Sequence, residues 1–131
     1  MTIAIDIQEV QSGYDQKTCW VQTRAGIVPH LNKAVMTTQK LRLSGSDIFY
    51  GINAIVSDDT GKSWGKPVPQ DAFKARDHEN GACFYVSDFC PQWHEQTQTL
   101  LGTGHTPCYK EIENYGGNNT IFVSKVAGMS S

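Results

Sequence analysis

Short apolar stretches follow one another along this chain, and glycine, asparagine, aspartate and proline residues separate them. Several of these stretches alternate apolar and polar residues, which is the two-residue period of a β-strand with one buried face. The stretches are TIAIDIQEV (2–10), CWVQTRAGIV (19–28), KAVMTTQKLRL (33–43), IFYGINAIVS (48–57), ACFYVSDF (82–89), QTLLGTGHT (98–106) and NTIFVSKV (119–126). Strands that are this short and this regularly interrupted predict an all-β sandwich, barrel or propeller. Helix is expected only as a turn or two, near 71–76 or 91–96.

The size and charge of the chain limit the classes of function that it can have. Its 131 residues suit one domain. With 11 basic and 13 acidic residues the net charge is -2, so bulk charge suggests neither nucleic acid nor a membrane as a partner. The first residues, MTIAIDIQEV, lack the basic start of a signal peptide. We therefore expect either a cytoplasmic protein or an exported one whose signal segment is missing here.

The four cysteines, Cys19, Cys83, Cys90 and Cys108, form no C-x-x-C pair. Buried reduced thiols are the first interpretation, and a single disulfide in an exported protein is the second. Their spacing with the histidines matches no zinc ligand set, so neither a metal nor another cofactor is expected.

The stretch SDDTGKSW (57–64) resembles an ion-binding loop at first sight. A calcium loop of the EF-hand type needs a glutamate at its twelfth position, which counted from Ser57 is Val68. A phosphate-binding P-loop needs an earlier glycine where Val56 stands, and a helix directly afterwards, which Pro67 opposes. The remaining interpretation is a tight turn, in which Asp and Ser side chains accept backbone N–H bonds and the indole of Trp64 packs beneath.

The same stretch resembles an Asp box at every defined position, with Ser57, Asp59, Gly61, Ser63 and Trp64 in place. Asp boxes are structural hairpins of sialidase-like six-bladed β-propellers, between the third and fourth strands of a blade. The segments LRLSGSDIFYGINAIVSDDTGKSWGKPVP and VSDFCPQWHEQTQTLLGTGHT also look like two successive blades of that family, in its BNR-repeat and exo-α-sialidase-like members.

This resemblance implies an incomplete propeller of about two to three antiparallel four-stranded blades in a single partial domain, 1–131. We expect leading strands over about 1–33, a blade with the Asp box over 34–78, and a following blade over 79–131. A six-bladed propeller needs roughly 300 residues at 40–50 for each blade. The chain would therefore be a fragment, a homo-oligomer whose copies complete the propeller, or a small sandwich that closes differently.

By resemblance the function would be that of a glycoside hydrolase acting on the terminal sugars of glycans. Asp47 occupies the place of the family's general acid/base, and sialidases use a tyrosine nucleophile rather than a second carboxylate. The tyrosine and later arginines belong to the last blades, so we expect no complete catalytic set in this chain alone. The family's first arginine lies in an aromatic-Arg-Ile-Pro motif, but here the motif is GIVP with Val28 in that place, which argues against sialic-acid specificity.

Other polar residues are candidates for contact with a carbohydrate. Arginines bind carboxylates, and histidine and carboxylate side chains bind sugar hydroxyls. These candidates are Arg24, Arg42, His78, Glu79, Asp88 and His105. Two alternatives to an enzyme remain open: a non-catalytic module that binds carbohydrate or assembles into an oligomeric propeller, and a purely structural β-repeat.

Overall fold

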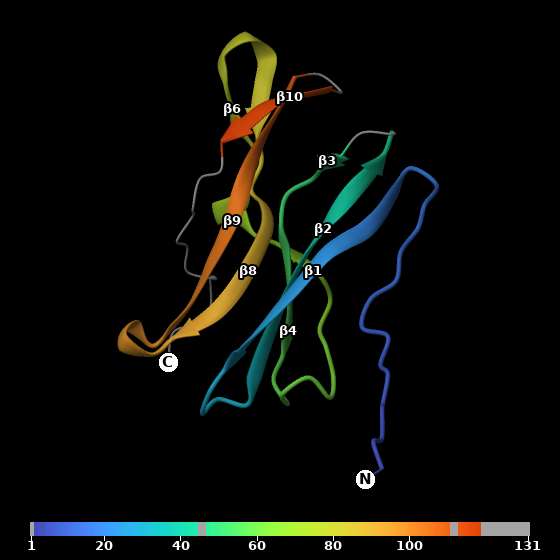
Figure 1. Cartoon of the computed structure of the whole chain (residues 1–131), viewed down its shortest axis with the longest axis vertical. Coiled ribbons are helices and arrows are strands. Elements are labelled where there is room, and N and C mark those ends of the chain that lie inside the picture. Colours follow the sequence, from blue (N-terminus) through green and yellow to red (C-terminus); the bar gives the residue numbers. More distant parts are fainter. Residues whose placement is uncertain (1, 45–46, 111–112, 119–131) are drawn as a thin grey trace.

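The computed structural model describes residues 2–44, 47–110 and 113–118, and these form two antiparallel β-sheets (Figure 1). The first sheet contains β1 (Thr18–Val28), β2 (Lys33–Leu43), β3 (Asp47–Phe49), β4 (Asn53–Ser57) and β5 (Val68–Pro69). The second contains β6 (Arg76–Asp77), β7 (Ala82–Phe84), β8 (Ser87–His94), β9 (Thr99–Lys110) and β10 (Glu113–Asn118). The fold class is therefore all-β, as the sequence predicts.

Each sheet is a meander once two of its strands are taken as one bent strand, because β3 and β4 both pair with β2 and β7 and β8 both pair with β9. The first sheet has the order β1-β2-β4-β5, with β3 also paired to β2. The second has the order β10-β9-β7-β6, with β8 also paired to β9. Helical structure in the described residues is limited to three 3-10 turns at Asp71–Phe73, Glu79–Gly81 and Glu95–Thr97, two of which lie where short helical turns are expected. No helix in the described ranges is long and apolar enough to cross a membrane.

The expected single strand over 48–57 is divided into β3 and β4. Phe49 pairs with Leu41 and Asn53 with Thr38, so four steps along one strand oppose three steps along its partner. One extra residue of this kind is a β-bulge, which bends a strand and releases its side chains from the regular alternation. Further irregularities interrupt β1 between Val21 and Arg24 and β8 between Ser87 and Cys90.

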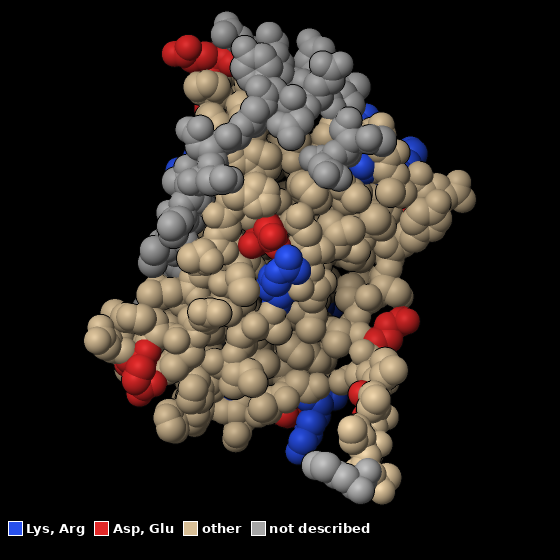
Figure 2. All heavy atoms as spheres, in the orientation of Figure 1, with Lys and Arg blue, Asp and Glu red and all other residues tan. Residues whose placement is uncertain are grey.

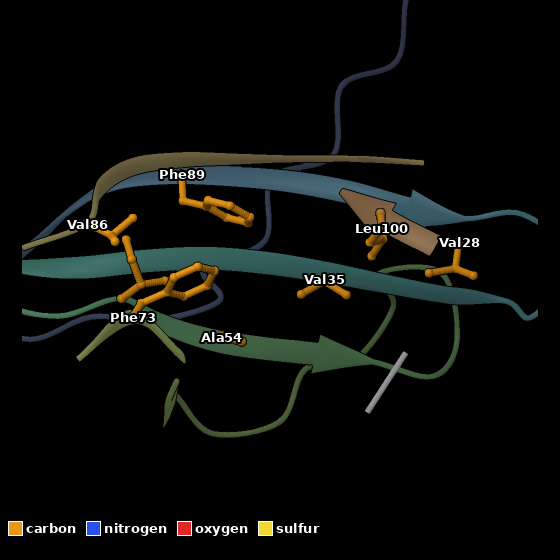
Figure 3. Close-up of a cluster of buried hydrophobic side chains, with 8 residues drawn as sticks. Val28, Val35, Ala54, Phe73, Val86, Phe89 and Leu100 are labelled. Atoms are coloured by element: carbon orange, nitrogen blue, oxygen red, sulfur yellow. The ribbon is translucent and has the colours of Figure 1, made fainter. Parts of the chain in front are cut away.

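The two sheets pack on each other through two clusters of buried apolar side chains, of which the larger contains residues of both sheets. Phe89 of β8 and Leu100 of β9 meet Val35 of β2 and Ala54 of β4, and all four are at most 3% exposed (Figure 3). The ring of Phe73, from the segment between the sheets, lies 4.6 Å from that of Phe89. Burial of this kind contributes about 25 cal/mol per Å² of apolar surface, and the core therefore fixes how the sheets face each other.

The chain before β1 is not a strand, although its alternation predicts one. Residues 2–13 form no ladder within the described part of the chain, and the segment stands apart from the sheets in Figure 1. The alternation supplies an apolar face, but a strand also needs a neighbouring strand to pair with its N–H and C=O groups. The expected strand over 119–126 lies outside the described residues. The proposed division at residues 34 and 79 stays a prediction.

Candidate functional site

A small hollow of about 200 Å³ opens between the two sheets, where β2 and β3 meet β7 and β9. Its lining combines one arginine with aromatic side chains from both sheets. The lining residues are Arg42, Ile48, Phe49, Tyr50, Gly81, Cys83, Tyr85 and Tyr109. We call this feature the Arg42 hollow.

The elements around the Arg42 hollow hold its aromatic walls in place. Arg42 lies directly opposite Ile48 in the pairing of β2 and β3. The hydroxyl of Tyr109 accepts a hydrogen bond of 3.4 Å from the backbone N–H of Phe49, which ties β9 to β3. The rings of Tyr85 and Tyr109 lie 5.7 Å apart at 57°, a tilted arrangement that aromatic pairs favour.

Two titratable groups that line the hollow have raised pKa values, which favour their neutral forms. Burial raises the pKa of the Tyr85 phenol. A hydrogen bond of 3.4 Å to the Asp77 carboxylate raises the pKa of the Cys83 thiol, and burial adds to this. Arg42 adds a guanidinium group to this lining, and its N–H donors make the hollow suitable for an anion or for sugar hydroxyls.

A buried glutamine connects the hollow to a polar junction between the sheets. The side chain of Gln39 is completely buried, and its amide N–H donates to the carbonyl of Tyr50 at 3.0 Å. Its amide oxygen accepts from Ser87 Oγ at 3.2 Å and from the backbone N–H of Asp88 at 2.9 Å. Ser87 Oγ also lies 3.1 Å from the amide oxygen of Gln22. Gln39 thus connects the bulges of β3–β4 and β8, and Ser87 extends this junction to Gln22 in the bulge of β1.

The same junction brings together two of the residues that the sequence nominates. Arg24 Nη2 lies 2.6 Å from Asp88 Oδ1, and both side chains remain more than a third exposed. Oδ1 makes no directed hydrogen bond, so the contact is an ion pair of the kind that contributes only ~0–1 kcal/mol at a surface. Asp88 and Gln22 both have a left-handed backbone, with φ of 54° and 52°, and such strain in non-glycine residues clusters at functional sites.

The two nominated arginines do not converge on one ligand. Arg24 pairs with Thr37, and Arg42 lies five residues further along β2, a separation of ~17 Å at ~3.3 Å for each residue. Val28, in the motif position of the family's arginine, pairs with Lys33, whereas Asp47 pairs with Leu43 at the other end of β2. An arginine at position 28 could not reach Asp47 in this fold.

The other nominated residues are distributed around this end of the molecule. The ring of His78 packs on that of Phe84, with the ring centroids 4.8 Å apart. Glu79 is exposed and begins the 3-10 turn Glu79–Gly81, whose last residue lines the hollow. His105 is half-buried and pairs with Ser87. Asp47 begins β3, directly before the lining residue Ile48, and its side chain lies outside what the structure describes.

Residues 57–64, the stretch that resembles an Asp box, form the hairpin between β4 and β5. Ser57 Oγ donates to Asp59 Oδ1 at 2.7 Å and accepts from the N–H of Gly61 at 2.7 Å. Ser63 donates to Asp59 through its backbone N–H at 2.8 Å and its hydroxyl at 2.6 Å, and these bonds lower the pKa of Asp59 to about 2. The indole N–H of Trp64 donates to the carbonyl of Gly61 at 3.1 Å, and the φ of 93° at that residue explains the glycine.

Charge gathers in no single patch on the face shown in Figure 2, where acidic and basic side chains are scattered among neutral ones. Within the described ranges, no group of three or more His, Cys, Asp or Glu side chains could hold a metal ion. The four cysteines, all of them described, are free.

Sequence reasoning missed the residues that organise this site. Gln39 and the three tyrosines of the hollow are not among the candidate residues that the sequence indicates. A signal for Gln39 is its position among the apolar residues of 33–43, because a polar side chain inside a strand that reads as core must find buried partners.

No protein-family model, no curated protein and no solved structure matches this chain.

Proposed function

We propose that this chain is a two-blade portion of a sialidase-like β-propeller, and that the Arg42 hollow binds the terminal sugar of a glycan. The fold part of this proposal is supported by the two meanders. If β3 and β4 count as one bent strand, the first sheet has four successive strands, and the Asp box joins the third to the fourth. That is the place of the box in a blade of the family.

The observation that carries the binding proposal is the arrangement of Arg42 among Tyr50, Tyr85 and Tyr109. Aromatic rings pack against the C–H faces of a sugar, while phenol and guanidinium groups bond its hydroxyls or a carboxylate. At about 200 Å³ the hollow is smaller than the ~300–1,000 Å³ of most small-molecule pockets. A single sugar at the end of a chain fits this size better than an extended glycan.

Hydrolysis is the second candidate, and the position of Asp47 favours it. Asp47 begins β3 and directly precedes Ile48, which lines the hollow. The protein would act as an enzyme only with a nucleophile from further blades, which another copy or another chain would supply. The geometry of the described residues supports binding more strongly, because the lining itself contains no carboxylate.

Isothermal titration of the full chain with a methyl sialoside and a methyl galactoside tests this proposal. We expect binding of one or both sugars, and at least a tenfold loss in Arg42→Ala. The matched control is Lys66→Ala, which removes an exposed positive charge after the Asp box. Absence of binding, or equal affinity in Arg42→Ala and Lys66→Ala, would contradict it. An aryl glycoside that is cleaved by the wild type and not by Asp47→Asn would establish the hydrolase instead.

A further inference from the structure

The segment before β1 carries an apolar face on which no other described residue packs closely. Ile3, Ile5 and Ile7 are 79%, 81% and 88% exposed, which is the largest exposure among the big apolar side chains of the described residues. This segment is tied to the rest of the described chain by a hydrogen bond of 3.0 Å, from the side-chain amide of Gln8 to the carbonyl of Lys62. Three isoleucines in two-residue alternation form a strand face, so the segment has the side chains of a strand without its partner.

The free edge of β1 in the same chain is a poor partner for this segment. Asp15 forms a tight turn that brings Tyr14 opposite Cys19, and an antiparallel hairpin continued from this bridge would place Val10 opposite Thr23. Thr23 lies in the β1 bulge, where the pairing with β2 shifts and Gln22 has a φ of 52°. A regular ladder cannot pass such a bulge, and the segment leaves the edge before reaching it.

The sequence of the segment is complementary to itself. An antiparallel pair of Ile3-Ala4-Ile5-Asp6-Ile7 segments centred on Ile5 places Ile3 opposite Ile7, and Ile5 opposite its own counterpart. Asp6 then lies opposite Ala4 rather than opposite another acid, and Thr2 lies opposite Gln8. All the isoleucines of both segments share one face of the resulting ribbon, and a two-fold axis relates the two chains.

We propose that residues 2–8 pair with the same residues of a second copy, as a two-stranded antiparallel ribbon centred on Ile5. The pairing satisfies the backbone N–H and C=O groups that face the partner segment, and it brings the isoleucines of the two segments into contact across the ribbon. Two-stranded ribbons are only marginally stable in water, so the dimer is weak and forms at high chain concentration. It is independent of sugar binding, because the segment contributes nothing to the Arg42 hollow.

Cysteine cross-linking of the full chain tests the register. Residues directly opposite each other in an antiparallel pair have Cα atoms ~4.5–5.5 Å apart, within the range of a disulfide. Ile5→Cys should therefore cross-link to its own counterpart, above the background of the parent chain with its native cysteines. Ile3→Cys, the matched control on the same face, lies four residues or ~14 Å from its own counterpart and should not. An equal mixture of Ile3→Cys and Ile7→Cys should cross-link again.

Light scattering over a concentration series up to about 1 mM measures the association itself. We expect the wild type to approach twice the mass of one chain, and Ile5→Asp to stay at the mass of one chain, because two like charges would face each other. Mixing Ile5→Asp with Ile5→Lys should restore the dimer, and Thr2→Asp should leave it intact. Circular dichroism checks that each variant is folded.

Three outcomes would overturn the proposal. The first is a wild type that stays at the mass of one chain throughout the series. The second is a dimer that Ile5→Asp leaves unchanged, which would place the contact elsewhere. The third is cross-linking of Ile3→Cys as readily as Ile5→Cys, which would indicate association without a register.

Discussion

The packing of the two sheets can be tested at Gly102, which pairs with Pro91 in the β8–β9 ladder. A Cβ atom at this position would lie 2.2 Å from Cζ and 2.4 Å from Cε1 of the Phe89 ring. Because ordinary contacts begin at 3.4 Å, the ring would have to retreat by about 1.2 Å, the difference between 3.4 and 2.2 Å. Phe89 is fully buried, and the Phe73 ring lies 4.6 Å away, so the core offers little room for this movement.

Gly102→Ala should therefore destabilise the fold by ~1–3 kcal/mol, which is the usual cost of overpacking a core. Gly51→Ala is the matched control, because its Cβ would lie 3.6 Å from the carbonyl oxygen of Phe73, an ordinary contact. Both variants lower the conformational entropy of the unfolded chain equally, which by itself stabilises each fold by ~0.4–1 kcal/mol. The difference between their free energies of unfolding therefore measures the clash alone. Urea unfolding followed by tryptophan fluorescence measures both. Equal free energies of unfolding would refute the packing of Phe89 against this strand.

Three further predictions concern the polar groups. The folded-state pKa of Asp59 is about 2, below its ordinary value of 3.8, so its carboxylate stabilises the fold above pH ~4 and this contribution is lost as the pH falls towards 2. Acid unfolding of Asp59→Asn, compared with the wild type, should show a shallower loss over that window; identical curves would be inconsistent with the Asp-box bonds. Gln39→Met leaves the carbonyl of Tyr50 and the hydroxyl of Ser87 without this hydrogen-bond partner. The free energy of unfolding measured in urea should therefore fall by at least ~1–3 kcal/mol. An unchanged free energy of unfolding would contradict these hydrogen bonds. The bond to Asp77 raises the pKa of Cys83, so Asp77→Asn should speed the labelling of this thiol by iodoacetamide at pH 8, and an unchanged rate would argue against the contact.

Periodicity and turn chemistry predict most of the strands, because alternation and the preference for β-branched residues are local properties. Periodicity fails for residues 2–10, since it describes the face of a strand and not the presence of a neighbour. Periodicity also misses the bulge between β3 and β4, where residues 50–52 include one more residue than the opposing stretch of β2. The bulge is defined by the pairing with β2, and Gly51 is its one local signal in the sequence.

The candidate site was predictable only in part, because it depends on contacts between residues distant in sequence. Arg24 and Asp88 were both nominated, but their pairing comes from the approach of β1 to β8, more than sixty residues apart. The tyrosines of the hollow come from both sheets, and they meet only because the apolar core sets the distance between the sheets. The buried side chain of Gln39 connects the two sheets, and this role becomes visible only when its partners Tyr50 and Ser87 are known.

Chemical-shift mapping of the sugar titration tests the central claim most directly. With the tyrosine rings labelled, a bound sugar should shift the resonances of Tyr50, Tyr85 and Tyr109, which line the Arg42 hollow, and leave that of the exposed Tyr14 in place. The same titration of Arg42→Ala should lose these shifts. Sugar-induced shifts that avoid the hollow, or that persist unchanged in Arg42→Ala, would contradict the assignment of the Arg42 hollow as the binding site.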